Sequence, residues 1–123
     1  DWKNFVRAII ESVAYQTHDL FNSMKNDGLK PRIVKIDGGM VKNNWFSQFL
    51  SDLININVLR PKVLETTALG VALFAGYGCG EFKSLDEIKR VWKKDRIFSP
   101  KLKKSTRNKL LKGWKLAIRK TLA

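Results

Sequence analysis

A short polar and glycine-rich segment, Asp37–Asn44, contains residue types suited to holding a ligand. Two successive glycines, Gly38 and Gly39, let the backbone approach a ligand without obstruction by a Cβ atom. Asn43 offers a hydrogen-bond donor and an acceptor, which suits the edge of a nucleobase or a ribose. The segment by itself also fits a simpler reading, in which the glycines make only a tight turn and Asn43 only caps a helix. It is neither a P-loop nor a Gly-x-Gly-x-x-Gly fingerprint.

Hydrophobic spacing predicts the elements that would position this segment. Apolar residues at helical spacing predict a helix over about Asp1–Lys25, which Gly28 would end, and β-branched residues predict a strand over Arg32–Ile36. Asn43 or Asn44 is expected to cap the next helix. The segment Asp37–Asn44 would then lie between a strand end and a helix start, which is where α/β sheets bind ligands. The buried face of that helix is predicted to comprise Trp45, Phe46, Phe49, Leu50, Leu53 and Ile54.

A second strand and a third helix complete the predicted core. The strand is expected over Asn55–Arg60, before Pro61, and the helix begins at a capping Thr66 or Thr67 and ends near Gly78. A strand–helix–strand unit of this length predicts a parallel pair of strands and an α/β fold. Small residues in the third helix predict close packing on its neighbours, and Glu65 is expected to interact with the start of that helix.

The remainder of the chain is predicted to be mainly helical. Ser84 and Glu87 form the pattern of a capping box at the start of a short helix, and Lys104–Leu122 predicts a basic amphipathic helix. Trp92 and Phe98 are expected to fold back onto the core. His18, the single histidine, lies between polar residues and is interpreted as a solvated side chain.

Composition restricts the function classes. The net charge of +13 attracts polyanions without specificity, and the sequence lacks the spacing of a zinc finger or of an RNA-binding sheet, so no specific nucleic-acid partner is expected. The single cysteine, Cys79, excludes a disulfide within the chain and is consistent with a reducing cytoplasm. The most apolar run, Ala68–Cys79, is too short to span a membrane, which needs about 20 residues.

The segment Val34–Asp52 resembles the adenosine-side motif of the glycerol kinases, which belong to the wider FGGY family of carbohydrate kinases. The Asn43-Asn44 and Thr66-Thr67 pairs favour the glycerol kinases over relatives such as xylulokinases. Other segments extend the resemblance over nearly the whole chain, namely Asn4–Glu11, Arg60-Pro61, Glu65–Gly70, Trp92, Phe98, Pro100 and Gly113–Lys115.

The resemblance implies part of an actin-like, ribonuclease-H-like α/β domain that is incomplete in this chain. It implies that residues 1–83 form the core of the carboxy-terminal nucleotide-binding domain and that residues 84–123 form a helical extension packed on it. The implied reaction transfers the γ-phosphate of ATP to glycerol, with Mg²⁺, and yields glycerol 3-phosphate. Gly39 and Asn43 would line the adenine-nucleotide pocket, and Gly38 would support the same turn.

The family's phosphate loop, glycerol-binding residues and catalytic aspartate precede the matched part. No catalytic residue or metal ligand is therefore expected in this chain, Asp37 is not expected to be the catalytic base, and the chain alone is expected to be inactive. The expected partners are ATP or ADP, glycerol bound by other residues, and the rest of a cytoplasmic, homo-oligomeric kinase. Two alternatives stay open, an inactive truncated remnant and a basic module that binds nucleic acid without specificity.

Overall fold

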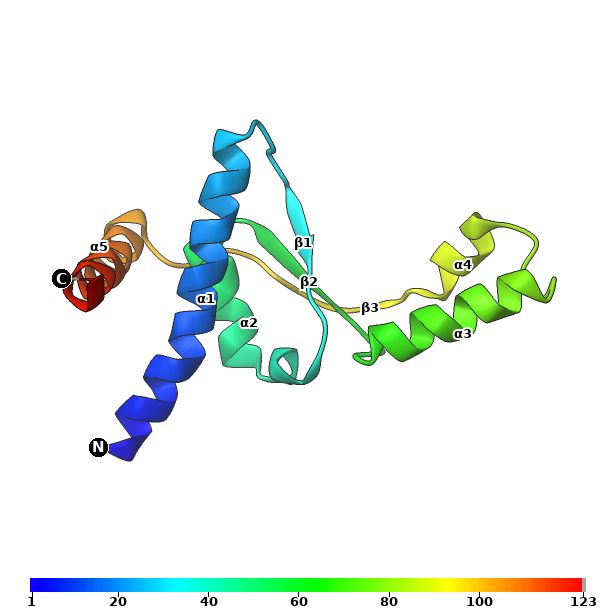
Figure 1. Ribbon diagram of the computed structural model, residues 1–123, viewed down its shortest axis with the longest axis horizontal. Coiled ribbons are helices and arrows are strands. Elements are labelled where there is room, and N and C mark those ends of the chain that lie inside the picture. The colour runs from blue at the N-terminus through cyan, green and yellow to red at the C-terminus, as the bar shows by residue number, and fades with distance from the viewer. Residues whose placement is uncertain (123) are drawn as a thin grey trace.

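The computed structural model describes residues 1–122. A long first helix, α1 (Trp2–Asn26), lies beside α2 (Asn44–Ile54) and next to a small sheet (Figure 1). The last helix, α5 (Lys104–Leu122), contacts both α1 and α2. Two further helices, α3 (Thr66–Gly78) and α4 (Leu85–Val91), extend away from this body and are called the arm below (Figure 1). The predicted order of helix, strand, helix, strand and helix is confirmed over residues 2–78.

Three strands form a sheet in the described part of the chain, in the order β1 (Ile33–Lys35), β2 (Asn57–Pro61) and β3 (Lys94–Phe98). The predicted parallel pair is confirmed, since β1 and β2 run parallel with Val34 opposite Val58. The antiparallel strand β3 was not predicted, although the expectation that Phe98 returns to the core is correct. The same expectation for Trp92 is wrong, since this side chain lies outside the core and contacts Lys35. The tail thus completes the sheet in addition to supplying α5.

The second strand begins two residues later than predicted. Asn55 does not extend, because it adopts the left-handed conformation (φ 57°) that ends α2, and its N–H donates to the carbonyl oxygen of Ser51. The strand ends at Pro61, where the pairing with β3 shifts register. Proline has no N–H to donate to a ladder, which accounts for the irregular pairing at this position.

The hydrophobic core lies between α1, α2 and the sheet. Leu53, Ile54 and Val58 are at most 2% exposed, and burial of each such side chain stabilises the fold by about 1.5–3 kcal/mol. Two buried serines of α2, Ser47 and Ser51, satisfy their hydroxyls on backbone carbonyls. The carbonyl oxygens of Ile56 and Phe98 each lie 2.9 Å from Ser51 Oγ and share its single hydroxyl proton. The predicted burial of Trp45 is wrong, because the residue is 42% exposed and its ring stacks on Phe49 at the edge of the core.

The contact between α1 and α5 is aromatic and polar. The rings of Tyr15 and Trp114 stack with centroids 5.2 Å apart, and Trp114 Nε1 donates a hydrogen bond of 2.6 Å to Asp19. His18 is 9% exposed and lines a hollow with Lys115, so its interpretation as a solvated side chain is wrong. The residues next to His18 in the sequence are polar, but α5, almost a hundred residues later, covers the imidazole.

The burial of His18 predicts a pH-dependent stability. Loss of hydration lowers the pKa of this imidazole below its usual value of about 6.5, Lys25 and Lys115 act in the same direction, and Asp19 opposes them. As the pH falls below about 6.5, the unfolded chain gains a proton that the folded chain resists, so the free energy of unfolding decreases.

Melting temperatures of the intact protein and of a His18→Gln variant, measured between about pH 7.5 and 5, test this effect. The wild type is expected to lose more stability on acidification than the variant. Parallel curves would show that His18 does not titrate as a buried group.

The arm carries its apolar side chains on the surface. Among the described residues none of α3 is buried, and Val71 and Phe74 are 67% and 64% exposed. The predicted close packing of its small residues is wrong for most of them, since a Cβ at Gly70 would meet no heavy atom of the described residues within 4 Å. It is seen at Gly76, where a Cβ would lie 2.9 Å from the ring of Phe82. The predicted capping box at Ser84 is half formed: the Ser84 hydroxyl accepts from the N–H of Glu87, but the Glu87 carboxylate accepts from the N–H of Lys83 and not from that of Ser84.

Candidate functional site

The segment Asp37–Asn44, called the nucleotide turn below after the role that the family resemblance implies for it, connects the end of β1 to the start of α2. It contains a 3-10 turn over Gly39–Lys42 that the sequence did not reveal. Gly38 has φ +88° and requires glycine, since side chains are strained in this conformation. Its N–H donates to the carbonyl oxygen of Leu64 at 3.1 Å, which attaches the turn to the segment after β2.

The space beside the two glycines is open. A Cβ built at either Gly38 or Gly39 would meet no heavy atom of residues 1–122 within 4 Å. The φ of Gly39 lies outside the left-handed region, so its backbone alone does not demand glycine. The bare backbone of Gly39 therefore faces room that a ligand can occupy.

Asn43 is the N-cap of α2, as predicted. Its Oδ1 accepts hydrogen bonds from the N–H groups of Trp45 at 2.9 Å and Phe46 at 3.3 Å. The side chain is exposed, and its Nδ2 remains available to donate outward. The capping role and a ligand-binding role are compatible, because they use different atoms of one amide.

A second helix start lies beside the turn. Thr66, the first residue of α3, donates its hydroxyl proton to the Asp37 carboxylate, which fixes that carboxylate at the end of β1. The prediction that Thr66 or Thr67 caps α3 is wrong, because Glu65 occupies the cap position and makes no capping hydrogen bond through its side chain. The starts of α2 and α3 thus flank the carboxyl ends of two parallel strands, where α/β sheets bind ligands.

Arg60 is the residue at this site that sequence reasoning did not single out. It belongs to β2, yet its guanidinium donates to the carbonyl oxygen of Val41 inside the nucleotide turn. The Arg60-Pro61 step contributed to the family resemblance but indicated no contact. The two residues are 19 positions apart, a separation that no local pattern reveals.

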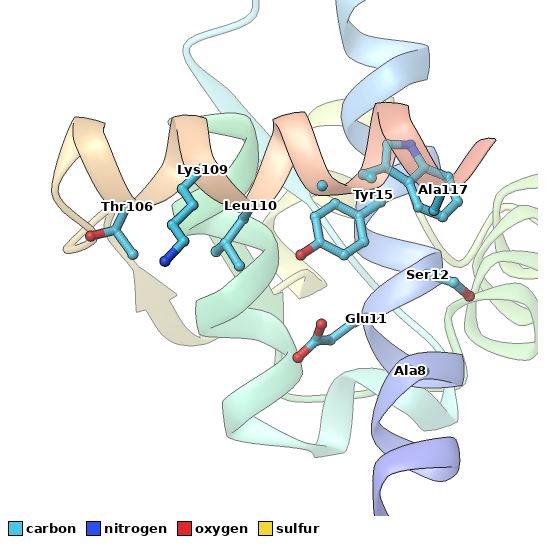
Figure 2. Close-up of a pocket in the computed structure, with 10 residues that line it drawn as sticks. Ala8, Glu11, Ser12, Tyr15, Thr106, Lys109, Leu110 and Ala117 are labelled. Atoms are coloured by element: carbon cyan, nitrogen blue, oxygen red, sulfur yellow. The ribbon is translucent and has the colours of Figure 1, made fainter. Parts of the chain in front are cut away.

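A large hollow lies elsewhere, between α1 and α5, with a volume of about 620 Å³ (Figure 2). Tyr15 and Leu110 line it, and the side chains of Glu11 and Tyr15 lie near each other at its centre (Figure 2). Burial, followed by the charge of Glu11, raises the pKa of the Tyr15 phenol and keeps it neutral. Its surface is mostly apolar and contains no residue of the nucleotide turn, so size alone does not identify the site.

A parallel strand pair with a glycine turn before a helix defines an α/β domain, and the comparisons with known kinases identify it as the actin-like, ribonuclease-H-like kind. Residues 1–79 match the FGGY family of carbohydrate kinases, C-terminal domain, and the chain belongs to this family. The chain is 48% identical over 120 residues to glycerol kinase of Gluconobacter oxydans, and 46% identical over 120 residues to glycerol kinase 2 of Sulfolobus acidocaldarius. These matches cover 97% of the chain but only 23% and 24% of the relatives, so the chain spans about a quarter of their length.

Solved structures agree with this assignment. A crystal structure of Plasmodium falciparum glycerol kinase with ADP superposes with a TM-score of 0.81 and 36% identity, covering 96% of this chain and 24% of the other. Xylulose kinase from Lactobacillus acidophilus shares the fold at a TM-score of 0.77 and 22% identity, over the same shares of the two chains. No helix among residues 1–122 is both long and apolar enough to cross a membrane.

Proposed function

We propose that this chain forms the adenine-nucleotide side of a kinase that transfers the γ-phosphate of ATP to glycerol. The observation that carries the proposal is the open space at Gly39, on a turn between a strand end and an asparagine-capped helix. The glycerol kinase relatives named above, one of them with ADP, support the choice of substrates. The product would be glycerol 3-phosphate.

Within this proposal, the residues of the chain bind and orient the nucleotide. The bare backbone at Gly39 admits the adenosine, and Asn43 Nδ2 donates to it while Oδ1 holds the start of α2. Fixing the adenosine helps to place the γ-phosphate in line with the acceptor hydroxyl, which is the main requirement of phosphoryl transfer. Asp37 is engaged by Thr66 and serves as a structural anchor.

Mg²⁺, the general base and the glycerol contacts are proposed to come from the rest of a kinase chain. Among the described residues no group of three or more His, Cys, Asp or Glu side chains could hold a metal ion.

The exposed apolar face of α3, with Val71 and Phe74, supports a covering partner. We propose the cytoplasm as the location and retain residues 1–83 and 84–123 as the two parts, although β3 joins the second part to the sheet of the first.

The function is tested by glycerol-dependent formation of ADP from ATP by the intact protein, combined with two variants of Asn43. Serine also caps helices well but lacks the amide Nδ2, so Asn43→Ser is expected to keep the melting temperature and to raise the KM for ATP about three- to tenfold. Asn43→Ala is expected to raise this KM similarly and, in addition, to lose about 1 kcal/mol of stability.

The KM for glycerol serves as the internal control, because the proposal places glycerol on other residues. A protein that forms no ADP in the presence of glycerol contradicts the proposed function. An unchanged KM for ATP in both variants would show that Asn43 serves only as the cap of α2.

A further inference from the structure

Arg60 of β2 makes an unusual number of contacts with the nucleotide turn. Its NH1 donates to the carbonyl oxygen of Val41 at 2.9 Å and to Asn44 Oδ1 at 2.9 Å, and it lies 3.4 Å from the carbonyl oxygen of Lys42. These acceptors lie on both sides of Asn43 in the sequence. A single guanidinium nitrogen therefore holds the backbone before Asn43 and the side chain after it.

The opposite edge of the guanidinium is fixed by β3. Arg60 Nε and NH2 lie 2.8 Å and 2.7 Å from Asp95 Oδ2, and the Phe98 ring centroid is 5.3 Å from the guanidinium carbon. The Arg60 side chain is only 12% exposed, although its partner Asp95 is 43% exposed, so the guanidinium itself is partly shielded from water while the acceptors on Asp95 and Asn44 are not. Hydrogen bonds of a planar, charged guanidinium are stronger and more directional than those between neutral groups.

We propose that Arg60 is a positioning residue for the nucleotide, and this inference rests on the proposed function. Arg60 does not contact the adenosine itself. It fixes the Val41–Asn44 backbone so that the space at Gly39 stays open and Nδ2 of Asn43 stays directed outward. Asp95 orients the guanidinium for this task, which links a strand of the tail to the nucleotide.

The pairing of the sheet supplies a matched control. Arg96 of β3 lies opposite Arg60 in the β2–β3 register and also places its guanidinium near the Phe98 ring, at 5.1 Å. Its side chain makes no hydrogen bond to the nucleotide turn within the described residues. Loss of Arg96 therefore removes a similar charge and a similar aromatic contact without touching the turn.

The experiment compares Arg60→Met, Arg60→Lys, Asp95→Asn and Arg96→Met in the intact protein. Arg60→Met is expected to raise the KM for ATP, and the Kd for ADP, by about tenfold or more, because charge-assisted hydrogen bonds to the turn are lost. Lysine keeps the charge but not the two-sided fork, so Arg60→Lys is expected to recover only part of this loss. Asp95→Asn should give a smaller increase, and Arg96→Met should leave ATP unaffected.

Two further readouts separate positioning from a general loss of structure. Amide hydrogen exchange without nucleotide is expected to accelerate over residues 41–44 in Arg60→Met and not in Arg96→Met. The KM for glycerol is expected to stay within about twofold of the wild type, because the proposed function places glycerol on residues outside this chain. A KM for glycerol that rises together with the KM for ATP would make Arg60 a merely structural residue and overturn the proposal.

The inference and the function on which it rests fail in different ways. A wild-type protein that binds no adenine nucleotide overturns both. A wild-type protein that binds ADP no better than Arg60→Met does, with unchanged exchange over residues 41–44, overturns the positioning role alone.

Discussion

Replacing Gly39 by valine is expected to raise the KM for ATP by about tenfold or more and to leave the KM for glycerol within about twofold. The Cβ and methyl groups of valine would enter the open space beside the nucleotide turn, which we assign to the adenosine. Folding should be preserved, because that Cβ meets no heavy atom of residues 1–122 within 4 Å and the backbone at Gly39 is not left-handed.

Two other glycines make this experiment specific. Gly113→Val in α5 also places a Cβ where none of the described atoms lies within 4 Å, but far from the turn, and should leave both constants unchanged. Gly38→Ala forces a side chain onto φ +88° and is expected to lower the melting temperature by straining the turn. If Gly39→Val melts normally and keeps its KM for ATP, the pocket lies elsewhere.

Replacing Asp52 by alanine is expected to lower the free energy of unfolding by about 1–3 kcal/mol, because partly buried N–H donors are left without their acceptor. Asp52 is 7% exposed, and its Oδ1 accepts from the N–H groups of Lys101 at 2.6 Å and Leu102 at 3.1 Å. It also accepts from Gln48 Nε2 at 3.1 Å. One carboxylate of α2 thus holds the chain between β3 and α5.

Denaturant titration of the intact protein measures this loss. Asp52→Asn retains an acceptor oxygen and should lose about half as much or less. Asp86→Ala removes a carboxylate that is 76% exposed and paired with Lys89, and it should change the stability by less than about 1 kcal/mol. Equal stabilities for Asp52→Ala and Asp86→Ala would show that other contacts hold the tail.

Sequence periodicity predicted the elements whose stability is local. The ends of α1 and α5 lie within one residue of expectation, and Asn43 caps α2 through two neighbouring N–H groups. The strand β3 escaped prediction because Lys94, Asp95 and Arg96 make it look like a solvated loop. Its place in the sheet depends on a partner more than thirty residues away.

Non-local contacts also explain the errors at individual residues. Thr66 has the right type for a helix cap, but its hydroxyl donates to Asp37, 29 residues earlier. His18 is buried by α5, and Arg60 reaches the turn across 16 to 19 positions. Gly38, Gly39 and Asn43 could be proposed from one short segment, whereas the residue that fastens this segment could be found only in three dimensions.

The arm is the part of the chain where insertions and deletions disturb the sheet least. Strands β2 and β3 are antiparallel neighbours, yet residues 62–93 separate them as a long excursion from what would otherwise be a hairpin. The entropic cost of closing such an excursion grows slowly, by about 0.6 kcal/mol for each doubling of its length. Thr66 secures only the near end of the arm, beside the turn. The bend between α3 and α4, residues 79–84, is therefore the place where segments can be gained or lost while the sheet and the turn keep their geometry.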